Sequence, residues 1–567
     1  MFKRLLLLAL LMVALVPVAT AQDTPDLAGL ARYFPADTAA YFSIRTDQTY
    51  FESLDGLITM VATAAGEEVP NGSVLAALDE MIRDETDGAY NYQTAIRDWL
   101  GDTLAFAIPN LTVMGEPDAV LVAEIRDREA LETLITLSDS AGGTPALERE
   151  TVGDSTLFRN VSARQESFLV SDTFVAMGRV SILESLFIRP DRMARLNTNG
   201  QFTAAVAALP ADSYNMIGYL NAQGFARQVL SVAAGSLPEG APEIDFDALT
   251  QAFGVQAFGA TIIDDRAFVL DLALIHGETT IMSALGLPEI VLGDMPPVDT
   301  AFARHAPADT LAYFQSTNDS EASLAMLDNM LTVGDAIIER YVRPIAEAAD
   351  DRDTLRELES FDLRQMEGML ESMFERQLGL PLDEVYTIFD GQAAAFLGIG
   401  AIDGERVLPA LAQVYENGSP ESAAKLIDGV KTLLTREEVP FTTRGNAITL
   451  NFNDMGSQDR VPVVLTLGAT NDLVVGGTAD YFDFAVNPSA DNLAATPSFI
   501  YEAGLMLPDA TLFGYVSGAE LLRAAELEGA EVPMVDRVLT PMLDSMGLSA
   551  VSGDSASVLR LTLTLKP

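Results

Sequence analysis

The sequence contains no cysteine, two histidines and only four lysines among its 567 residues. The absence of cysteine excludes disulfides, zinc–thiolate sites, iron–sulfur clusters, thiol catalysis and lipidation of an N-terminal cysteine. So few lysines leave almost nothing for a Schiff base or a phosphate-binding lysine. Only 34 Lys and Arg stand against 82 Asp and Glu, for a formal charge of −48. This charge argues against nucleic acid and anionic membranes as partners, because both are bound through dense Lys and Arg.

What the chain has in quantity is apolar residues. They make up 49% of the sequence, and the mean hydropathy is +0.21, which excludes a disordered or collagen-like chain. The length suffices for two or more domains with cores of their own. The acidic, lysine-poor composition fits either high solubility or adaptation to a saline habitat, and both readings stay open.

The N-terminus has the three parts of a secretory signal. Lys3 and Arg4 precede an apolar run over residues 5–16, and Ala19-Thr20-Ala21 forms a small-x-small cleavage site. We therefore expect a signal peptide over 1–21, cleavage before Gln22, and a soluble product that is secreted or periplasmic. The alternative is an uncleaved N-terminal anchor.

One stretch of sequence occurs twice. Arg32–Phe42 reads RYFPADTAAYF, and Arg304–Phe314 reads RHAPADTLAYF. Four further landmarks recur in the same order: Trp99–Phe106 with Phe389–Phe396, Phe168–Gly178 with Leu467–Gly477, Leu209–Tyr219 with Leu507–Tyr515, and Val255–Leu274 with Leu548–Leu565. This order indicates a duplication, with a first module over 22–280, a linker over 281–300 and a second module over 301–567.

Both strand and helix periods are present. Four leucines from Leu559 to Leu565 alternate with Arg560, Thr562 and Thr564, as expected of a strand with one face in water, and Ala267–Leu274 behaves in the same way. Apolar stripes over 324–341 and 355–374 predict helices, the first bent or ended by Pro344 and the second stopped by Gly379 and Pro381. The predicted fold class is α+β: two tandem diverged copies of a module with a mainly antiparallel sheet covered by helices.

The repeated Pro-Ala-Asp-Thr element is explained by turn chemistry. Proline fixes φ, the aspartate accepts a backbone N–H bond within the turn, and the threonine begins a strand. The functional alternative makes Asp37 and Asp309 ligands at two matching sites.

Together, the signal, the Pro35-Ala36-Asp37-Thr38 and Pro307-Ala308-Asp309-Thr310 elements and Trp99-Leu100-Gly101 resemble an exported bacterial family, domain of unknown function 3352. The second half departs from the pattern, with Ile388-Phe389-Asp390-Gly391 where Trp-Leu-Gly is expected. The resemblance implies export and a bacterial source, and it supplies no catalytic residues.

Residues that carry chemistry are few. We interpret His305, in the position of Tyr33 in the repeat, as an aromatic-sized structural residue, and His276 as a surface residue at a strand end. Common hydrolase and nucleotide-binding motifs are absent. The close carboxylate groups are Asp245/Asp247, Asp264/Asp265, Asp350/Asp351/Asp353 and Glu437/Glu438. Nothing selects one pair as a glycosidase dyad, and the calcium-loop register of 451–462 fails at Pro462. The sequence therefore assigns no catalytic, cofactor-binding or metal-ligating residue.

Five methionines lie on the two helices predicted after the second repeat: Met326, Met330, Met366, Met369 and Met373. Methionine fills gaps between packed helices and also lines adaptable protein-binding surfaces. We favour the first role, with the second open if the helices protrude.

We therefore expect an exported protein without catalytic activity, with a binding or structural role at the cell envelope or outside the cell. Its partners would be a protein at the envelope and weakly bound surface cations. The alternative is a carboxylate-dependent hydrolase that acts on envelope polymers in a cleft between the two modules. Whether the chain is an enzyme is left open.

Overall fold

The structure is a computed structural model. It describes residues 25–52, 54–56, 74–85, 88, 90–110, 118–141, 147–160, 166–188, 193–233, 244–263, 266–289, 295–349, 351–360, 363–403, 406–451, 464–527, 542–553 and 555–566. The expected signal peptide, Asp264, Asp265, Asp350 and residues 452–463 lie outside these ranges.

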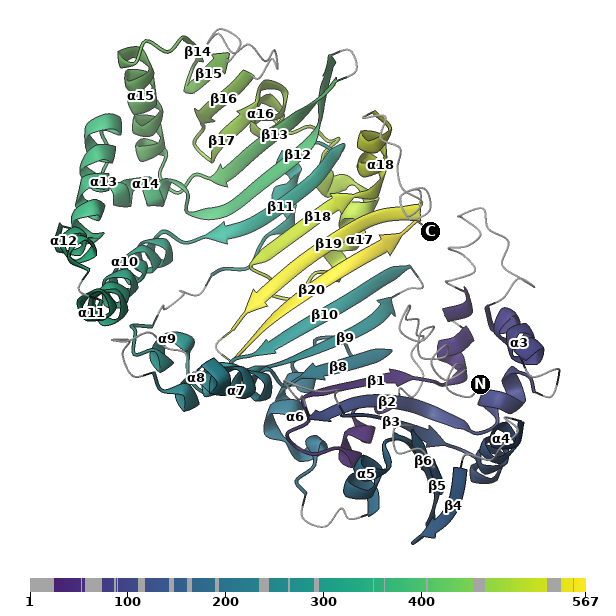
Figure 1. Ribbon diagram of the computed structural model, residues 1–567. Helices are drawn as coiled ribbons and strands as arrows, with labels where there is room; N and C mark the ends of the chain where they lie inside the picture. Colours follow the sequence, from purple (N-terminus) through teal and green to yellow (C-terminus); the bar gives the residue numbers. More distant parts are fainter. Residues whose placement is uncertain are drawn as a thin grey trace.

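A single antiparallel sheet of twenty strands runs through the described part of the chain (Figure 1). The first half contributes β1 (Ala40–Arg45), β2 (Leu100–Asn110), β3 (Asp118–Ile125), β4 (Leu147–Val152), β5 (Ser155–Asn160), β6 (Ser167–Val170), β7 (Phe174–Gly178), β8 (Met216–Leu220), β9 (Val255–Ile263) and β10 (Ala267–Ile275). The second half contributes β11 (Thr310–Asn318), β12 (Gly391–Asp403), β13 (Arg406–Glu416), β14 (Phe441–Arg444), β15 (Ala447–Asn451), β16 (Val464–Ala469), β17 (Leu473–Thr478), β18 (Leu512–Ser517), β19 (Leu543–Ser552) and β20 (Ala556–Leu565).

Strand pairing follows the same order in both halves. From one edge to the middle it runs β4-β5-β6-β7-β3-β2-β1-β8-β9-β10. From the other edge it runs β14-β15-β16-β17-β13-β12-β11-β18-β19-β20. Strands β10 and β20 pair antiparallel from Ala267↔Thr564 to Ile275↔Ala556 and join the two series. The mainly antiparallel sheet of the predicted α+β class is confirmed, but the two halves share it instead of having one each.

Helices lie on both faces of the sheet. On one face, the underside, α6 (Gly200–Ala207) packs under the first half and α17 (Pro497–Leu505) under the second. Their aromatic rings occupy corresponding places, since Phe202 contacts Tyr41 and Tyr219, with ring centroids 5.6 and 5.1 Å apart. Phe499 contacts Tyr313 and Tyr515 at 5.8 and 5.3 Å. The short helices α5 (Val180–Leu183) and α16 (Ala479–Val486) contribute to the same two cores.

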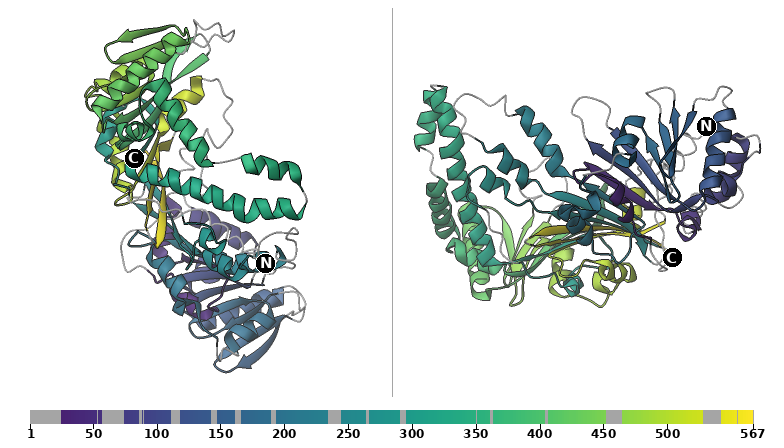
Figure 2. Two further views of the ribbon diagram at one scale, coloured as in Figure 1. Left: turned by 90° about the vertical axis from the view of Figure 1, so that its left-hand side faces the viewer. Right: turned by 90° about the horizontal axis from the view of Figure 1, so that it is seen from below.

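The opposite face carries helices at its two ends. There, α4 (Arg128–Ala141) covers one end and α15 (Pro420–Arg436) the other, next to α13 (Leu363–Leu378) and α14 (Leu382–Ile388). Figure 2 shows the sheet as a curved layer from which the long helices rise on one side. Further helices at the strand ends are α3 (Val74–Glu85), α7 (Ala222–Ala233), α8 (Phe246–Ala252), α9 (Ile281–Ala284), α10 (Ser320–Ile337), α11 (Arg343–Ala348), α12 (Arg352–Ser360) and α18 (Gly518–Leu527).

The face of β20 that the alternation predicted to lie in water is in fact buried. Arg560, Thr562 and Thr564 are buried on the underside, whereas Leu561, on the other face, is 42% exposed. Strand β10 shows the same inversion, because Asp271 is fully buried and Leu272 is 38% exposed. The alternation of the two strands was predicted correctly. The sequence could not show which face is covered, because that depends on where the helices lie.

The predicted helices are present with altered limits. The first continues through a π-turn over Ile338–Val342 into α11, and Pro344 stands in the first turn of α11 without ending the helix. The described residues of the second stripe lie in α12 and α13, and residues 361 and 362 between them lie outside the described ranges. Helix α13 ends at Leu378, before Gly379 with φ +74°, as predicted.

The hydroxyl of the threonine, and not the aspartate, closes the Pro-Ala-Asp-Thr turn. Thr38 donates its Oγ1 hydrogen to the Pro35 carbonyl at 2.7 Å, and Thr310 does the same to Pro307 at 2.7 Å. Asp37 and Asp309 are exposed at the corner. Each element is also held by a β-bridge, Pro35 to Arg195 and Pro307 to Asn492.

Among the described residues, no helix has the length and apolar character needed to span a bilayer.

Candidate binding surface

An apolar surface covers the open face of the sheet between the end helices. Directly opposite residues of antiparallel strands point to the same side, so the register defines its rows. One row runs Leu411, Leu397, Ala312, Val516, Met546. The next runs Gln413, Ala395, Phe314, Gly514, Leu548, Leu561. We call these eleven residues the apolar floor.

The apolar floor is both exposed and hollowed. Phe314, Leu397 and Leu411 are 43%, 37% and 41% exposed, although leucine and phenylalanine are residues that usually lie in a core. A hollow of about 610 Å³ opens above the floor, a size typical of ligand sites. Beyond the floor, exposed apolar side chains continue across the junction with Leu272, Leu274 and Leu220, and the polar residues Ser557 and Gln256 stand in the row of Leu274 and Leu220.

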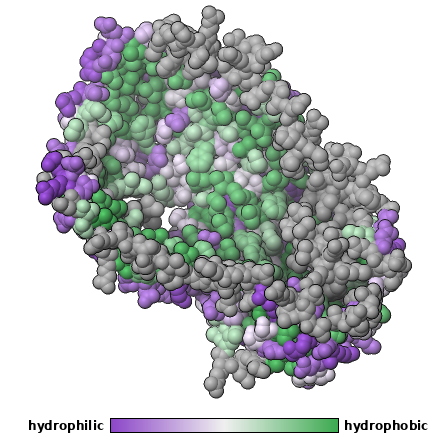
Figure 3. All heavy atoms as spheres, in the orientation of Figure 1, coloured by the Kyte–Doolittle hydropathy of each residue, from purple (hydrophilic) through white to green (hydrophobic). Residues whose placement is uncertain are grey.

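No charged side chain belongs to the apolar floor, and Gln413 is its single polar one. Figure 3 shows this contrast directly: hydrophobic colour fills the middle of the face over β11–β13 and β18–β20, and hydrophilic colour lies on the outer helices. With strands about 4.8 Å apart, the six strands of the floor span roughly 24 Å. The floor is therefore an elongated uncharged surface on a protein of charge −48.

The same face is covered at its two ends. In the first half Leu131, Leu134 and Ile135 of α4 pack on Leu121 and Ala123 of β3 in a buried cluster. In the second half Ala423 and Leu426 of α15 cover Val474 of β17. The exposed strip in the middle is thus the part of the face that no described helix covers.

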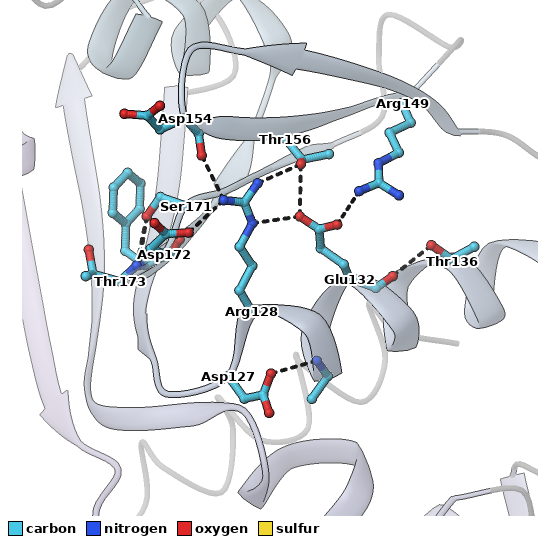
Figure 4. A network of polar contacts seen from close by, with 12 residues as sticks. Asp127, Arg128, Glu132, Thr136, Arg149, Asp154, Thr156, Ser171, Asp172 and Thr173 are labelled. Carbon is cyan, nitrogen blue, oxygen red and sulfur yellow. Dashed lines mark hydrogen bonds and ion pairs between the residues drawn. The ribbon is translucent and has the colours of Figure 1, made fainter.

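A saturated polar network holds α4 in place (Figure 4). Arg128 donates to the carboxylates of Glu132 and Asp172 at 2.8 and 2.7 Å and to the Thr156 hydroxyl at 2.9 Å. Glu132 also accepts from Thr156 and Arg149. Burial raises the pKa of Glu132, but the bonds from Arg128 and Thr156 outweigh it and the net shift is downward. Because its groups are satisfied by one another, the network holds α4 over β3 at the first-half end of the open face and needs no ligand.

Beneath the junction lies a buried ion pair. Arg560 donates Nε and Nη2 hydrogens to Asp271 at 2.7 and 2.9 Å, and an Nη1 hydrogen to the Leu505 carbonyl at 3.1 Å. Tyr214 donates to the same carboxylate at 2.6 Å. Burial alone lowers the pKa of Arg560, but its bonds to Asp271 outweigh this and raise it. The pair is thus satisfied on the side of the sheet away from the floor.

A second buried acid lies under β19 and β20. Glu502 of α17 is 1% exposed and accepts from Ser545 at 2.7 Å and Thr564 at 2.9 Å through Oε2. Its Oε1 has no hydrogen-bond partner among the described atoms. Burial raises the pKa of Glu502, and the two hydroxyl bonds offset this only in part.

The two histidines lie apart from the floor. His305 is 7% exposed; its Nδ1 lies 2.8 Å from the Ala485 carbonyl, and its ring packs on Phe302. Burial lowers the pKa of His305. His276 is exposed after β10, with Nε2 3.1 Å from the Ser557 hydroxyl.

The described members of the acidic groups serve local structure. Asp245 caps α8 by accepting from the backbone N–H groups of Asp247 and Ala248. Asp351 accepts from Thr354, Asp353 lies 3.5 Å from Arg356, and Glu437 lies 3.0 Å from Arg436. The structure brings none of these groups to the floor, and no three described Asp, Glu or His side chains gather as metal ligands would.

The methionines do not fill a gap between helices. Met326, Met330, Met369 and Met373 are 42%, 54%, 65% and 40% exposed, and the side chain of Met366 lies outside the described set. Figure 2 shows α10 and α13 projecting from the sheet, so the gap-filling interpretation is wrong for these four.

A family model described as "Protein of unknown function (DUF3352)" matches residues 4–318, more than half of the chain. The chain belongs to the DUF3352 family. Searches of curated proteins and of solved structures found no match. In this DUF3352 protein the family match covers β1–β11, so it includes Ala312 and Phe314 but not the rest of the apolar floor. The floor was not predicted from the sequence. The leucines of β20 were its one signal, and their alternation with polar residues led us to expect the leucine face to be covered, whereas Leu561 is exposed.

Proposed function

We propose that this DUF3352 protein is an exported binding protein without catalytic activity, and that its ligand lies on the apolar floor. The observation that carries the proposal is an elongated hollow without a charged side chain in a protein of charge −48. Fully burying one leucine or phenylalanine side chain contributes about 1.5–3 kcal/mol. A ligand that covers Phe314, Leu397, Leu411 and Leu561 therefore gains a substantial part of that free energy at each residue.

We also propose that the two halves are diverged copies of one module. Support comes from the identical strand order, the matching bridges at Pro35 and Pro307, and the matching rings of Phe202 and Phe499. The N-terminal pattern supports export, and N-terminal sequencing of protein recovered outside the cytoplasm tests it. The expected first residue is Gln22, and a chain that retains Met1 would contradict cleavage.

The alternative, a hydrolase in a cleft between the modules, has less support. The described junction is a ladder of paired residues from β10 and β20, with Asp271 and Arg560 buried beneath it. The described carboxylates at this junction are engaged in hydrogen bonds or ion pairs with their neighbours.

Binding of a neutral, environment-sensitive apolar dye such as Nile red tests the proposal. We expect dye fluorescence to saturate, and Phe314→Glu and Leu397→Glu each to weaken binding about tenfold or more, because each places a charge on the floor. Ile500→Glu is the matched control, since Ile500 is 57% exposed on α17, on the other side of the sheet. The proposal is wrong if both floor variants bind the dye like the unmodified protein, or if Ile500→Glu loses as much.

A further inference from the structure

We infer that the ligand is a single lipid-like amphiphile whose acyl chain lies along the apolar floor and whose head group carries no net negative charge. The inference rests on the proposed function and specifies the class of ligand. Two features of the floor support the inference. The floor offers no unpaired backbone group and only one polar side chain, and it is recessed between helices.

The backbone of the floor is not free to bind a peptide strand. Every floor strand has a partner on both sides: β11 lies between β12 and β18, and β19 lies between β18 and β20. Gln413 is the single polar side chain of the floor. A peptide lying extended there would leave its own N–H and C=O groups unpaired, which is costly away from water. An acyl chain has no such groups and therefore leaves none unpaired.

The position of the floor favours a single molecule over a membrane surface. Figure 2 shows the long helices rising on the open side of the curved sheet, so a flat bilayer meets the helices before it reaches the sheet. A single chain can enter the hollow of about 610 Å³ from above. Helix α10, which begins directly after floor strand β11, carries a further exposed apolar side chain, Met330.

Charge restricts the head group. The floor offers no cation to pair with a phosphate or carboxylate, and the protein as a whole carries −48. The negative charge of the protein would repel an anionic head group at the mouth of the hollow, and no ion pair would compensate for this repulsion. A zwitterionic or uncharged head group remains in water at no such cost.

The test uses the full purified protein with Nile red bound and titrates in monomeric lysophosphatidylcholines of increasing chain length. We expect displacement of the dye, with affinity rising by up to about fourfold per added methylene, as burial of a methylene predicts. Native mass spectrometry should show one lipid per chain. Lysophosphatidylglycerol of equal chain length should bind about tenfold more weakly at low salt, with the difference shrinking as salt is raised. Phe314→Glu should lose the lipid, and Ile500→Glu should keep it.

The outcomes separate this inference from the proposed function. If the dye binds and responds to the floor variants but no lysolipid displaces it, the lipid inference is wrong and the binding function stands. If neither dye nor lysolipid binds, both are wrong. Displacement by an apolar helical peptide but not by lysolipid would assign the floor to a protein partner instead. Flotation of the protein with intact phosphatidylcholine vesicles, without extraction of lipid, would assign it to a membrane surface and overturn the inference.

Discussion

Asp271 of β10 lies directly opposite Arg560 of β20, and the two side chains form a doubly hydrogen-bonded ion pair that is almost fully buried. Within its own hairpin Asp271 lies opposite Gly259, and Arg560 lies opposite Ser549. In the proposed duplication these two residues are therefore counterparts, and the axis that relates the halves passes between them. Divergence of one ancestral position into an acid and a base would have produced the pair.

Removing one member of this pair should destabilise the protein strongly. Arg560→Met leaves the Asp271 carboxylate buried with only Tyr214 as a partner, a change that costs about 3–5 kcal/mol. The double variant Asp271→Leu with Arg560→Met removes both charges and should recover most of the loss. Thermal unfolding of the single and double variants measures this coupling. Equal melting temperatures for the unmodified protein and Arg560→Met would show that the pair does not stabilise the junction.

Glu502 should make stability depend on pH. Because burial raises its pKa, the folded protein keeps this proton at pH values where the unfolded chain has lost it. The stabilisation is fully present below the usual glutamate pKa of about 4.5 and is lost as pH rises through the raised value. The nearby Asp544 acts in the same direction and Arg266 opposes it.

The matched variants are Glu502→Gln, which stays neutral, and Glu526→Gln on the exposed surface of α18. Relative to the unmodified protein, Glu502→Gln should gain melting temperature as the pH is raised above about 4.5, and Glu526→Gln should not. A constant difference between Glu502→Gln and the unmodified protein at all pH values would contradict the assignment.

Thr38→Val and Thr310→Val should have similar effects. Each removes a buried hydroxyl bond of 2.7 Å to a proline carbonyl while keeping the β-branched shape. We expect a loss of about 1 kcal/mol in each case. Denaturant titration of both variants checks this, with Thr203→Val as the control, since Thr203 lies on the exposed side of α6. No loss in either variant would mean that the turn is held without the threonine hydroxyl.

Calcium should stabilise the protein no more than sodium chloride of equal ionic strength. The described acidic groups are dispersed over local turns and helix ends, and no three of them converge. Melting curves with calcium, with chelator and with matched salt make the comparison. A specific site at 100 times its dissociation constant would add about 2.7 kcal/mol, and a shift of that size with calcium alone would contradict the expectation.

The elements that were predicted correctly from the sequence are those with local causes. The hairpins β9–β10 and β19–β20 follow from alternation and short turns, and Gly379 ends α13 by its left-handed φ. The predictions that were wrong concern features that depend on contacts between residues far apart in the sequence. Alternation shows which residues of β20 share a face, but not which face is covered.

The burial of Arg560 requires Asp271, which lies 289 residues earlier in the chain. The apolar floor could not be predicted from the sequence for the same reason. Leu397 and Leu561 look like ordinary core residues in the sequence, and only the positions of α4 and α15 leave their face open.

The pairing of β10 with β20 also bears on how the chain is made. During synthesis, β10 emerges as an unpaired edge long before its partner strand, so the first half presents an open ladder of backbone groups while the second half is still being translated. Contacts of such high sequence separation form slowly, and the growing sheet would be prone to associate with other chains in the interval. We therefore expect the first half to associate with other chains more readily than the complete protein does, until β20 is available to cover β10.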